Sequence, residues 1–162
     1  MGADAELQRK AGPKQAGSSG RPIRFAAEVE AQPLAVRMLL YALLKRLERH
    51  IGPADAGSIE LVLAEILNNI VEHAYDEGCT GALELVAELR PATLDCRVRD
   101  WGRPLPGHAI PLGGLPSTAV AIGYLPEGGW GWALIRDVAR DLRYGRDGDC
   151  NVVQLAIPLS FD

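Results

Sequence analysis

The sequence is short of the features that define several classes of protein. It has only three cysteines, Cys79, Cys96 and Cys150, which are widely spaced and form no C-x-x-C pair. A disulfide framework or a zinc site is therefore not expected, and the thiols are interpreted as free and mostly as packing residues in a reducing cytosol. No apolar run reaches the roughly 18 residues of a membrane span. The N-terminus shows no apolar secretory segment. We therefore expect a cytoplasmic protein with no membrane partner.

Positive charge is also scarce, because 17 lysines and arginines face 21 acidic residues and leave a net charge of −4. Nucleic-acid binding without sequence preference needs a basic surface, so no direct nucleic-acid partner is expected. The sequence has no G-x-x-x-x-G-K-[ST] phosphate loop and no G-x-G-x-x-G motif framed by a βαβ unit. What remains, with 48% hydrophobic and 23% charged residues, is typical of one soluble globular domain.

The order of patterns along the chain predicts the fold class. Residues 1–20 hold Leu7 as their only large apolar residue, which predicts a disordered tail followed by one domain over residues 21–162. The predicted elements are a strand at 22–30, a helix from Pro33 to about His50, a helix from the cap Asp55 to about Tyr75, a hairpin of strands at 82–90 and 93–100, a helix at 131–141, and strands at 142–146 and 152–159.

Because these strands come in hairpins rather than in βαβ units, they predict an α+β sandwich with helices on one face of the sheet. In the first helix, Leu34, Met38, Tyr41, Leu44 and Leu47 recur at helical spacing. Residues 101–128 are rich in Gly and Pro and low in charge. A loop of that length inside a compact domain is usually functional, so it is interpreted as a lid.

The second helix carries polar residues along one line beside its apolar stripe. Glu65, Asn69 and His73 recur at every fourth position, and the line that they form is about 12 Å long at 1.5 Å per residue. That length suits a small charged ligand lying against the helix. The alternative interpretation is a surface acid, an amide at the core boundary and a core histidine.

Two further motifs favour a ligand. Asp100 ends a predicted strand, where its carboxylate can accept a hydrogen bond from an exocyclic amino group, and Gly102 lets a flat ring approach the backbone closely. Gly128, Gly129 and Gly131 precede a helix, whose N-terminal N–H groups and dipole suit an anion. Taken alone, these motifs are also compatible with a simple turn and a loop hinge.

Together the motifs E-x-x-x-N-x-x-x-H-A (from Glu65), D-x-G-x-P (from Asp100) and G-G-x-G (from Gly128) resemble the Bergerat-fold ATP-binding superfamily. This superfamily includes gyrase-type ATPases, histidine-kinase catalytic domains and certain serine kinases. The H-A-Y ending and the domain size look most like the anti-sigma-factor serine/threonine kinases of bacterial partner-switching systems. The resemblance covers about residues 22–159. It implies a two-layer α/β sandwich whose sheet is mixed and mostly antiparallel.

The resemblance also implies roles for individual residues. Glu65 would be the general base on the attacking hydroxyl, and Asn69 would bind the Mg²⁺ that bridges the triphosphate. Asp100 would contact the adenine amino group, Gly102 would permit close packing of the base, and His73 would support the site. The set implied for binding ATP or ADP is Asn69, His73, Asp100, Gly102, Gly128, Gly129, Gly131 and Trp132.

The implied partners are a sigma factor that the protein sequesters, a small antagonist protein with a phosphoacceptor serine, and a second copy in a homodimer. Arg37 on the first helix is a candidate partner contact or a solvated helix residue. The alternative is a non-catalytic module in which ATP gates partner binding. A histidine-kinase fragment is disfavoured because no dimerisation helix with a phosphoacceptor histidine precedes residue 22. A gyrase-class ATPase would need a further transducer domain.

The sequence departs from the family pattern at three places. The lid has only Arg103 and His108 as possible cations. Trp132 stands where a small aliphatic residue, usually leucine, follows the last glycine. The final strand lacks a threonine that relatives often have, for which Asn151 or Gln154 could substitute.

Overall fold

The computed structural model describes residues 22–76, 78–79, 81–112 and 130–160. The predicted tail, residues 113–128 of the predicted lid, and Gly128 and Gly129 lie outside the described residues. The elements in chain order are β1 (Ile23–Glu30), α1 (Pro33–Leu47), α2 (Pro53–His73), β2 (Ala82–Leu89), β3 (Thr93–Asp100), the short 3-10 helix η1 (Pro106–His108), α3 (Trp130–Val138), β4 (Arg140–Asp147) and β5 (Cys150–Pro158).

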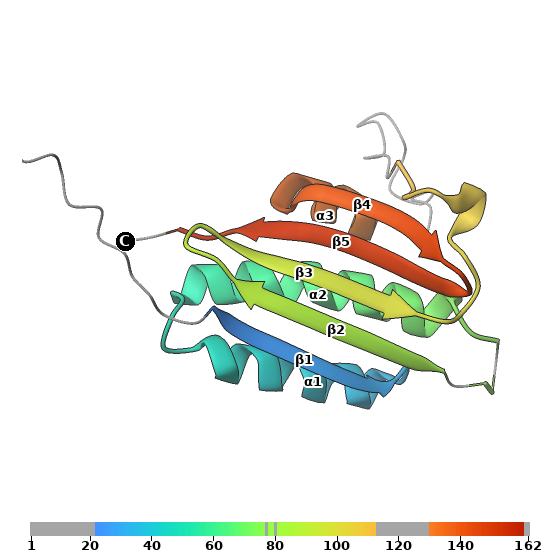
Figure 1. The fold of residues 1–162 in the computed structure, drawn as a ribbon, viewed down its shortest axis with the longest axis horizontal. Helices are drawn as coiled ribbons and strands as arrows, with labels where there is room; N and C mark the ends of the chain where they lie inside the picture. The colour runs from blue at the N-terminus through green and yellow to red at the C-terminus, as the bar shows by residue number, and fades with distance from the viewer. Residues whose placement is uncertain (1–21, 77, 80, 113–129, 161–162) are drawn as a thin grey trace, which may run out of the picture.

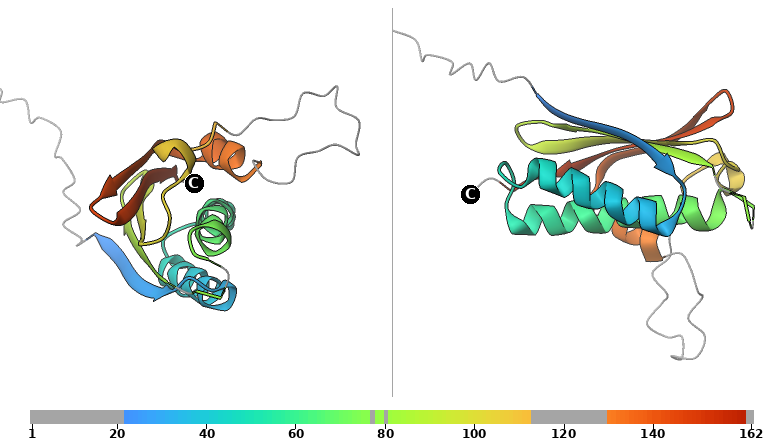
Figure 2. Two further views of the ribbon diagram at one scale, coloured as in Figure 1. Left: turned by 90° about the vertical axis from the view of Figure 1, so that its right-hand side faces the viewer. Right: turned by 90° about the horizontal axis from the view of Figure 1, so that it is seen from below.

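The strands form one sheet of five strands in the order β1-β2-β3-β5-β4. The helices α1, α2 and α3 lie on one face of this sheet, and the other face carries no described helix (Figures 1 and 2). The predicted α+β sandwich is therefore confirmed. All four strand pairings in the described chain are antiparallel, so the parallel component allowed for in a mixed sheet does not occur there.

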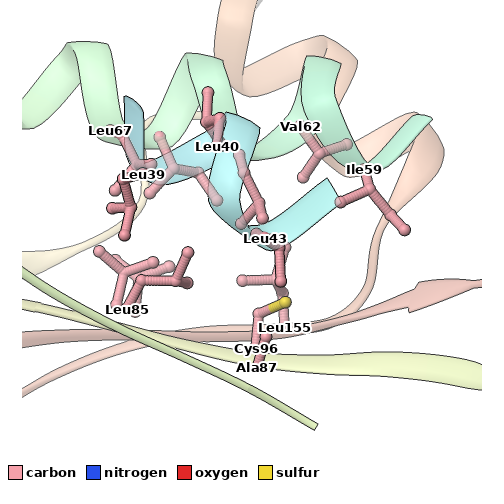
Figure 3. Close-up of a cluster of buried hydrophobic side chains, with 14 of the residues drawn as sticks. Leu39, Leu40, Leu43, Ile59, Val62, Leu67, Leu85, Ala87, Cys96 and Leu155 are labelled. Carbon is pink, nitrogen blue, oxygen red and sulfur yellow. The ribbon is translucent and has the colours of Figure 1, made fainter. Parts of the chain in front are cut away.

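The core lies between the helices and the sheet. Each strand alternates inward and outward residues, as the strict alternation of half-buried and exposed positions along β1 shows. The stripe on α2 is buried as predicted, with Ile59, Leu63 and Leu67 fully inaccessible. Side chains of α1 and α2 meet those of β2, β3 and β5 in this layer (Figure 3). Burying each such aliphatic side chain contributes about 1.5–3 kcal/mol to folding.

Helix α1 is apolar on two faces, which the sequence pattern did not distinguish. Three of the residues at the predicted spacing are largely exposed: Leu34 at 69%, Met38 at 57% and Tyr41 at 63%. The residues that α1 buries in the core are Val36, Leu39, Leu40, Leu43 and Leu47, and of these only Leu47 belongs to the predicted set. Leu34, Met38 and Tyr41 therefore lie outside the core and form an exposed apolar stripe on the surface of the described chain.

The prediction that Asp55 caps α2 is also wrong. The N-cap is Gly52, and it makes no side-chain capping bond. Asp55 lies in the first turn, is buried, and accepts hydrogen bonds from the backbone N–H of Ser160 at 3.0 Å and 3.2 Å. The carboxylate thus fastens the end of the described chain to the start of α2, where it also complements the helix dipole.

The three thiols differ in accessibility, which gives a simple prediction. Cys79 is exposed, whereas Cys96 and Cys150 are buried, and burial raises the pKa of Cys96 to about 12. Because the thiolate is the reactive form, we expect only Cys79 to react quickly with a thiol reagent at about pH 8. Counting labelled thiols in native and denatured protein checks this. Rapid modification of Cys96 in native protein would contradict the packing described here.

Every helix in the described ranges is too short or too polar to cross a lipid bilayer.

Candidate functional site

A cavity of about 290 Å³ lies between the C-terminal half of α2, α3 and the inner face of β3, β5 and β4. Ile70, Trp132 and Val153 contribute apolar walls, and Asp100 and Asn151 contribute polar groups. Ligand pockets of this character enclose a mostly apolar ligand and orient it with a few polar contacts. The volume is at the small end of the usual range of about 300–1,000 Å³, so it suits a single flat ring system.

The carboxylate of Asp100 is the main polar group of the cavity. Asp100 is the last residue of β3, is only 4% exposed, and pairs across the sheet with Asn151 of β5. Its Oδ1 accepts hydrogen bonds from the backbone N–H of Gly102 at 2.9 Å and from Asn151 Nδ2 at 2.8 Å. Within the described chain no donor reaches Oδ2, so this oxygen remains available to a ligand.

Burial raises the pKa of Asp100 above the ordinary aspartate value, while the hydrogen bonds from Asn151 and Gly102 and the charge of Arg146 oppose that rise. The two hydrogen-bond donors and the positive charge of Arg146 favour the ionised form, which is the form that only accepts hydrogen bonds. The sequence prediction that Asp100 can receive an exocyclic amino group is consistent with this geometry.

The glycine at 102 is needed for a different contact from the predicted one. A Cβ there would overlap the carbonyl oxygen and the Cβ of Ala74 at the end of α2. The neighbouring N–H of Arg103 donates to the same carbonyl at 2.7 Å. The close approach observed is therefore that of the turn after β3 to the end of α2. This contact fixes Asp100 at one end of the cavity.

Tyr75 adds a second clamp at this end. Its hydroxyl donates to the carbonyl of Ala82 at 2.6 Å and accepts from the backbone N–H of Trp101 at 3.0 Å. Arg103, predicted as a cation of the lid, pairs instead with Asp76 at 3.2 Å. These contacts join the end of α2, the start of β2 and the turn after β3 into one unit.

The polar line on α2 follows the cavity, but its members differ in burial. The amide nitrogen of Asn69 is buried and has no hydrogen-bond partner among the described residues. Such an orphaned group costs stability and needs an explanation, and a ligand that supplies the missing partner is one. His73 is not a core histidine, because its side chain is 72% exposed at the rim of the cavity.

Glu65 lies one helical turn beyond Asn69, about 6 Å along the axis of α2. Its carboxylate touches Gly131 in the first turn of α3, where a Cβ would overlap Oε2 of Glu65. The last glycine of the G-G-x-G motif is thus brought beside the acid. Gly128 and Gly129 lie outside the described residues. The following residue, Trp132, is buried and lines the cavity, as its place in the predicted set requires.

The side-chain oxygen of Asn69 and the carboxylate oxygens of Glu65 are hard ligands of the kind that Mg²⁺ prefers. The described residues contain no cluster of three or more His, Cys, Asp or Glu side chains that could hold a metal ion. The donor set therefore fits Mg²⁺ only where phosphate oxygens complete the coordination.

Three residues of the site were not predicted as site residues or were left undecided. Asn151, and not the exposed Gln154, is the polar residue of β5 that reaches Asp100. The other two residues are Tyr144 and Arg146 of β4, which donate hydrogen bonds to Oδ1 of Asn151. The signal for Asn151 was available, because it is the one polar residue among the inward positions of β5, which are otherwise occupied by Val153, Leu155 and Ile157.

Comparison with known families agrees with this geometry. A family model described as "Histidine kinase-like ATPase domain" matches residues 25–157. A search of curated proteins found no similar sequence. The match spans β1 to β5 and therefore includes every element that lines the cavity.

Proposed function

The chain belongs to the histidine kinase-like ATPase domain family, and from this premise we propose that it is an ATP-dependent serine/threonine kinase and anti-sigma factor. Membership of the family implies that the domain binds ATP or ADP. The observation that supports the site most directly is Asp100, which lines a cavity large enough for a purine and whose Oδ2 has no hydrogen-bond partner in the described chain. The kinase activity and the partners are the further content of the proposal.

In this proposal the base occupies the cavity and the phosphates extend along α2. Asp100 accepts a hydrogen bond from the exocyclic amino group, and Trp132 and Ile70 cover the ring. Farther along α2, the amide of Asn69 binds the cation and its phosphate ligands. Mg²⁺ supplies neutralisation of the phosphate charge, which is the main requirement of phosphoryl transfer.

Glu65 is the proposed general base. It precedes Asn69 by one turn on the same helix face, on the side away from Asp100, and it does not itself line the cavity. A carboxylate there can orient a serine hydroxyl of the antagonist protein and accept its proton. Phosphoryl transfer requires such positioning more than covalent participation of the protein.

The exposed apolar stripe on α1 supports a protein partner. Leu34, Met38 and Tyr41 lie along one face of the helix with exposed Arg37 between them. Exposed apolar patches of this kind mark interaction surfaces. We assign this stripe to the sequestered sigma factor, with Arg37 as a contact, and the antagonist would compete for it. The proposal includes a homodimer and a cytoplasmic location.

A non-catalytic, ATP-gated regulator is the second candidate, and two contacts favour it. The carboxylate of Glu65 lies against Gly131, and Arg103 is engaged by Asp76. Both side chains are therefore engaged by other parts of the chain. In such a regulator the nucleotide would change partner affinity without transfer of a phosphoryl group.

Incubation of the protein with γ-labelled ATP, Mg²⁺ and candidate antagonist proteins distinguishes the two. The kinase proposal predicts label on a serine of one candidate, and mass spectrometry would locate it. Nucleotide binding without transfer to any candidate, combined with ATP-dependent partner binding, would favour the regulator and contradict the kinase.

Binding of the base is expected to depend on pH through Asp100. Because burial raises its folded-state pKa, acidification protonates Asp100 at a higher pH than it would an exposed aspartate. The amino group then loses its acceptor. We expect adenosine affinity to fall as the pH is lowered from neutrality through the folded-state pKa of Asp100, by up to about tenfold for one lost hydrogen bond to a charged group. The stability of the ligand-free protein should change in the opposite direction. Because the pKa of Asp100 is raised in the folded state, its protonation at low pH removes the cost of burying a charge, so this group favours folding more as the pH falls.

Adenosine is the better probe, because the terminal phosphate of ADP itself titrates near pH 6. A His73→Gln background removes the only imidazole among the described residues that line the cavity. Saturation-transfer NMR at several pH values would measure the affinity. An affinity independent of pH in this range would contradict the role of the Asp100 carboxylate.

A further inference from the structure

The side chain of Asn151 is bound on both sides. Its Nδ2 donates to Asp100 Oδ1 at 2.8 Å and to the backbone carbonyls of Gly102 and Arg103 at 3.2 Å and 3.0 Å. Its Oδ1 accepts from the Tyr144 hydroxyl and from Arg146 Nη1, both at 2.7 Å. Because the groups on one side only accept and those on the other side donate, a flipped amide would lose these bonds. The orientation of this amide is therefore fixed.

The position of Asn151 determines which oxygen of Asp100 is free. Since the amide of Asn151 and the N–H of Gly102 both use Oδ1, Oδ2 is the oxygen available to a ligand. An ionised carboxylate oxygen only accepts hydrogen bonds. It is matched to a 6-amino group on a purine and mismatched to a 6-oxo group, which also only accepts. A site built for one hydrogen-bonding pattern rejects the other, because the buried partners are left unpaired.

Tyr144 and Arg146 hold this arrangement from β4. The Tyr144 hydroxyl also accepts from the backbone N–H of Leu105 at 3.1 Å, so it connects Asn151 to the segment that follows the D-x-G turn. Arg146 places a positive charge on the side of the amide away from Asp100. Neither residue has a hydrogen bond to Asp100 in the described chain. Both act on it through Asn151.

We infer that Tyr144 and Arg146 are positioning residues that make the cavity selective for 6-amino over 6-oxo purines by fixing Asn151 against Asp100. The inference rests on the proposed nucleotide binding and adds to it the residues that decide base selectivity. Loss of the two donors leaves Oδ1 of Asn151 without partners in the described chain, so that only the bonds of Nδ2 then oppose rotation of the amide. A rotated amide can offer its own N–H groups to a 6-oxo purine.

The test compares ADP with inosine diphosphate, which differs at position 6 of the base, by calorimetry on the full chain. The wild type should bind ADP at least about 100-fold more tightly. Tyr144→Phe keeps the ring, and we expect it to reduce this ratio about tenfold, the size of one hydrogen bond. Tyr144→Phe combined with Arg146→Met should reduce it further. Arg143→Met, an exposed residue on the outward face of the same strand, is the matched control and should keep the wild-type ratio.

The ratio of the two affinities distinguishes a positioning role from general support of the fold. A structural defect would weaken the binding of ADP and of inosine diphosphate by the same factor and would leave the ratio unchanged. An unchanged ratio in Tyr144→Phe and Arg146→Met would overturn the inference. So would a wild-type protein that binds ADP and inosine diphosphate equally, although nucleotide binding itself would then stand. If the wild type bound neither, the proposed function would fail together with the inference. Should the double variant not fold, the single variant at the exposed Arg146 carries the test.

Discussion

Asp100→Asn is expected to weaken ADP binding by about 100-fold while leaving the fold intact, because it replaces an acceptor by a group that also donates toward the amino group of the base. The substitution changes no volume at a position that is 4% exposed. It also removes the negative charge whose burial raises the pKa of Asp100. The melting temperature at neutral pH should therefore fall little, and the substitution should affect ADP affinity alone.

Asp95→Asn is the matched control for this prediction. Asp95 lies on the same strand, but it points to the outer face of the sheet and pairs with Arg90 at 3.2 Å. Calorimetric titration of both variants and a melting curve of each would make the comparison. Equal ADP affinity in Asp100→Asn and the wild type would contradict the assignment of the base to this cavity.

Glu65→Gln is expected to lower the rate of phosphoryl transfer to the antagonist protein by about 10²–10⁴-fold, the usual contribution of a general base. ADP affinity should change little, because Glu65 does not line the cavity. The amide keeps the size of the side chain and its contact with Gly131. The measurement is a single-turnover assay with labelled ATP, which reports transfer separately from product release.

Glu60→Gln serves as the control, since Glu60 is exposed on α2 and lies more than one turn before Glu65. Transfer at the wild-type rate in Glu65→Gln would show that another group accepts the proton, or that none needs to. If the control variant lost activity to the same extent, the effect would belong to the general charge of α2 and not to a base.

The sequence predicted the elements of this fold well where periodicity was strong. The stripe on α2, the hairpin β2–β3 and the two C-terminal strands are found within a few residues of the predicted ranges. Periodicity failed at α1, because apolar residues occur on both of its faces. A sequence pattern does not indicate which of two apolar faces meets the sheet. Leu34, Met38 and Tyr41 lie on the face that is exposed.

The site was predicted in part for a similar reason. Asp100, Asn69 and Trp132 were recognisable from motifs and are found at one cavity. Tyr144 and Arg146 were missed, because their role depends on the pairing of β4 with β5, which brings them to Asn151. Gly102 was predicted as a position where a ligand ring approaches the backbone, whereas the close approach that the structure shows is that of Ala74. Contacts between segments distant in sequence are set by the register of the strands, and the patterns read from this one sequence did not reveal how β4 pairs with β5.

The central claim is that a nucleotide binds between α2 and the inner face of the sheet with its base on Asp100. Isothermal titration of folded wild-type protein with ADP in the presence of Mg²⁺ tests it most directly. The account predicts saturable binding of about one nucleotide per chain, weakened about 100-fold in Asp100→Asn and unchanged in Asp95→Asn. The absence of any heat of binding at millimolar ADP and ATP, in protein that melts cooperatively, would contradict it.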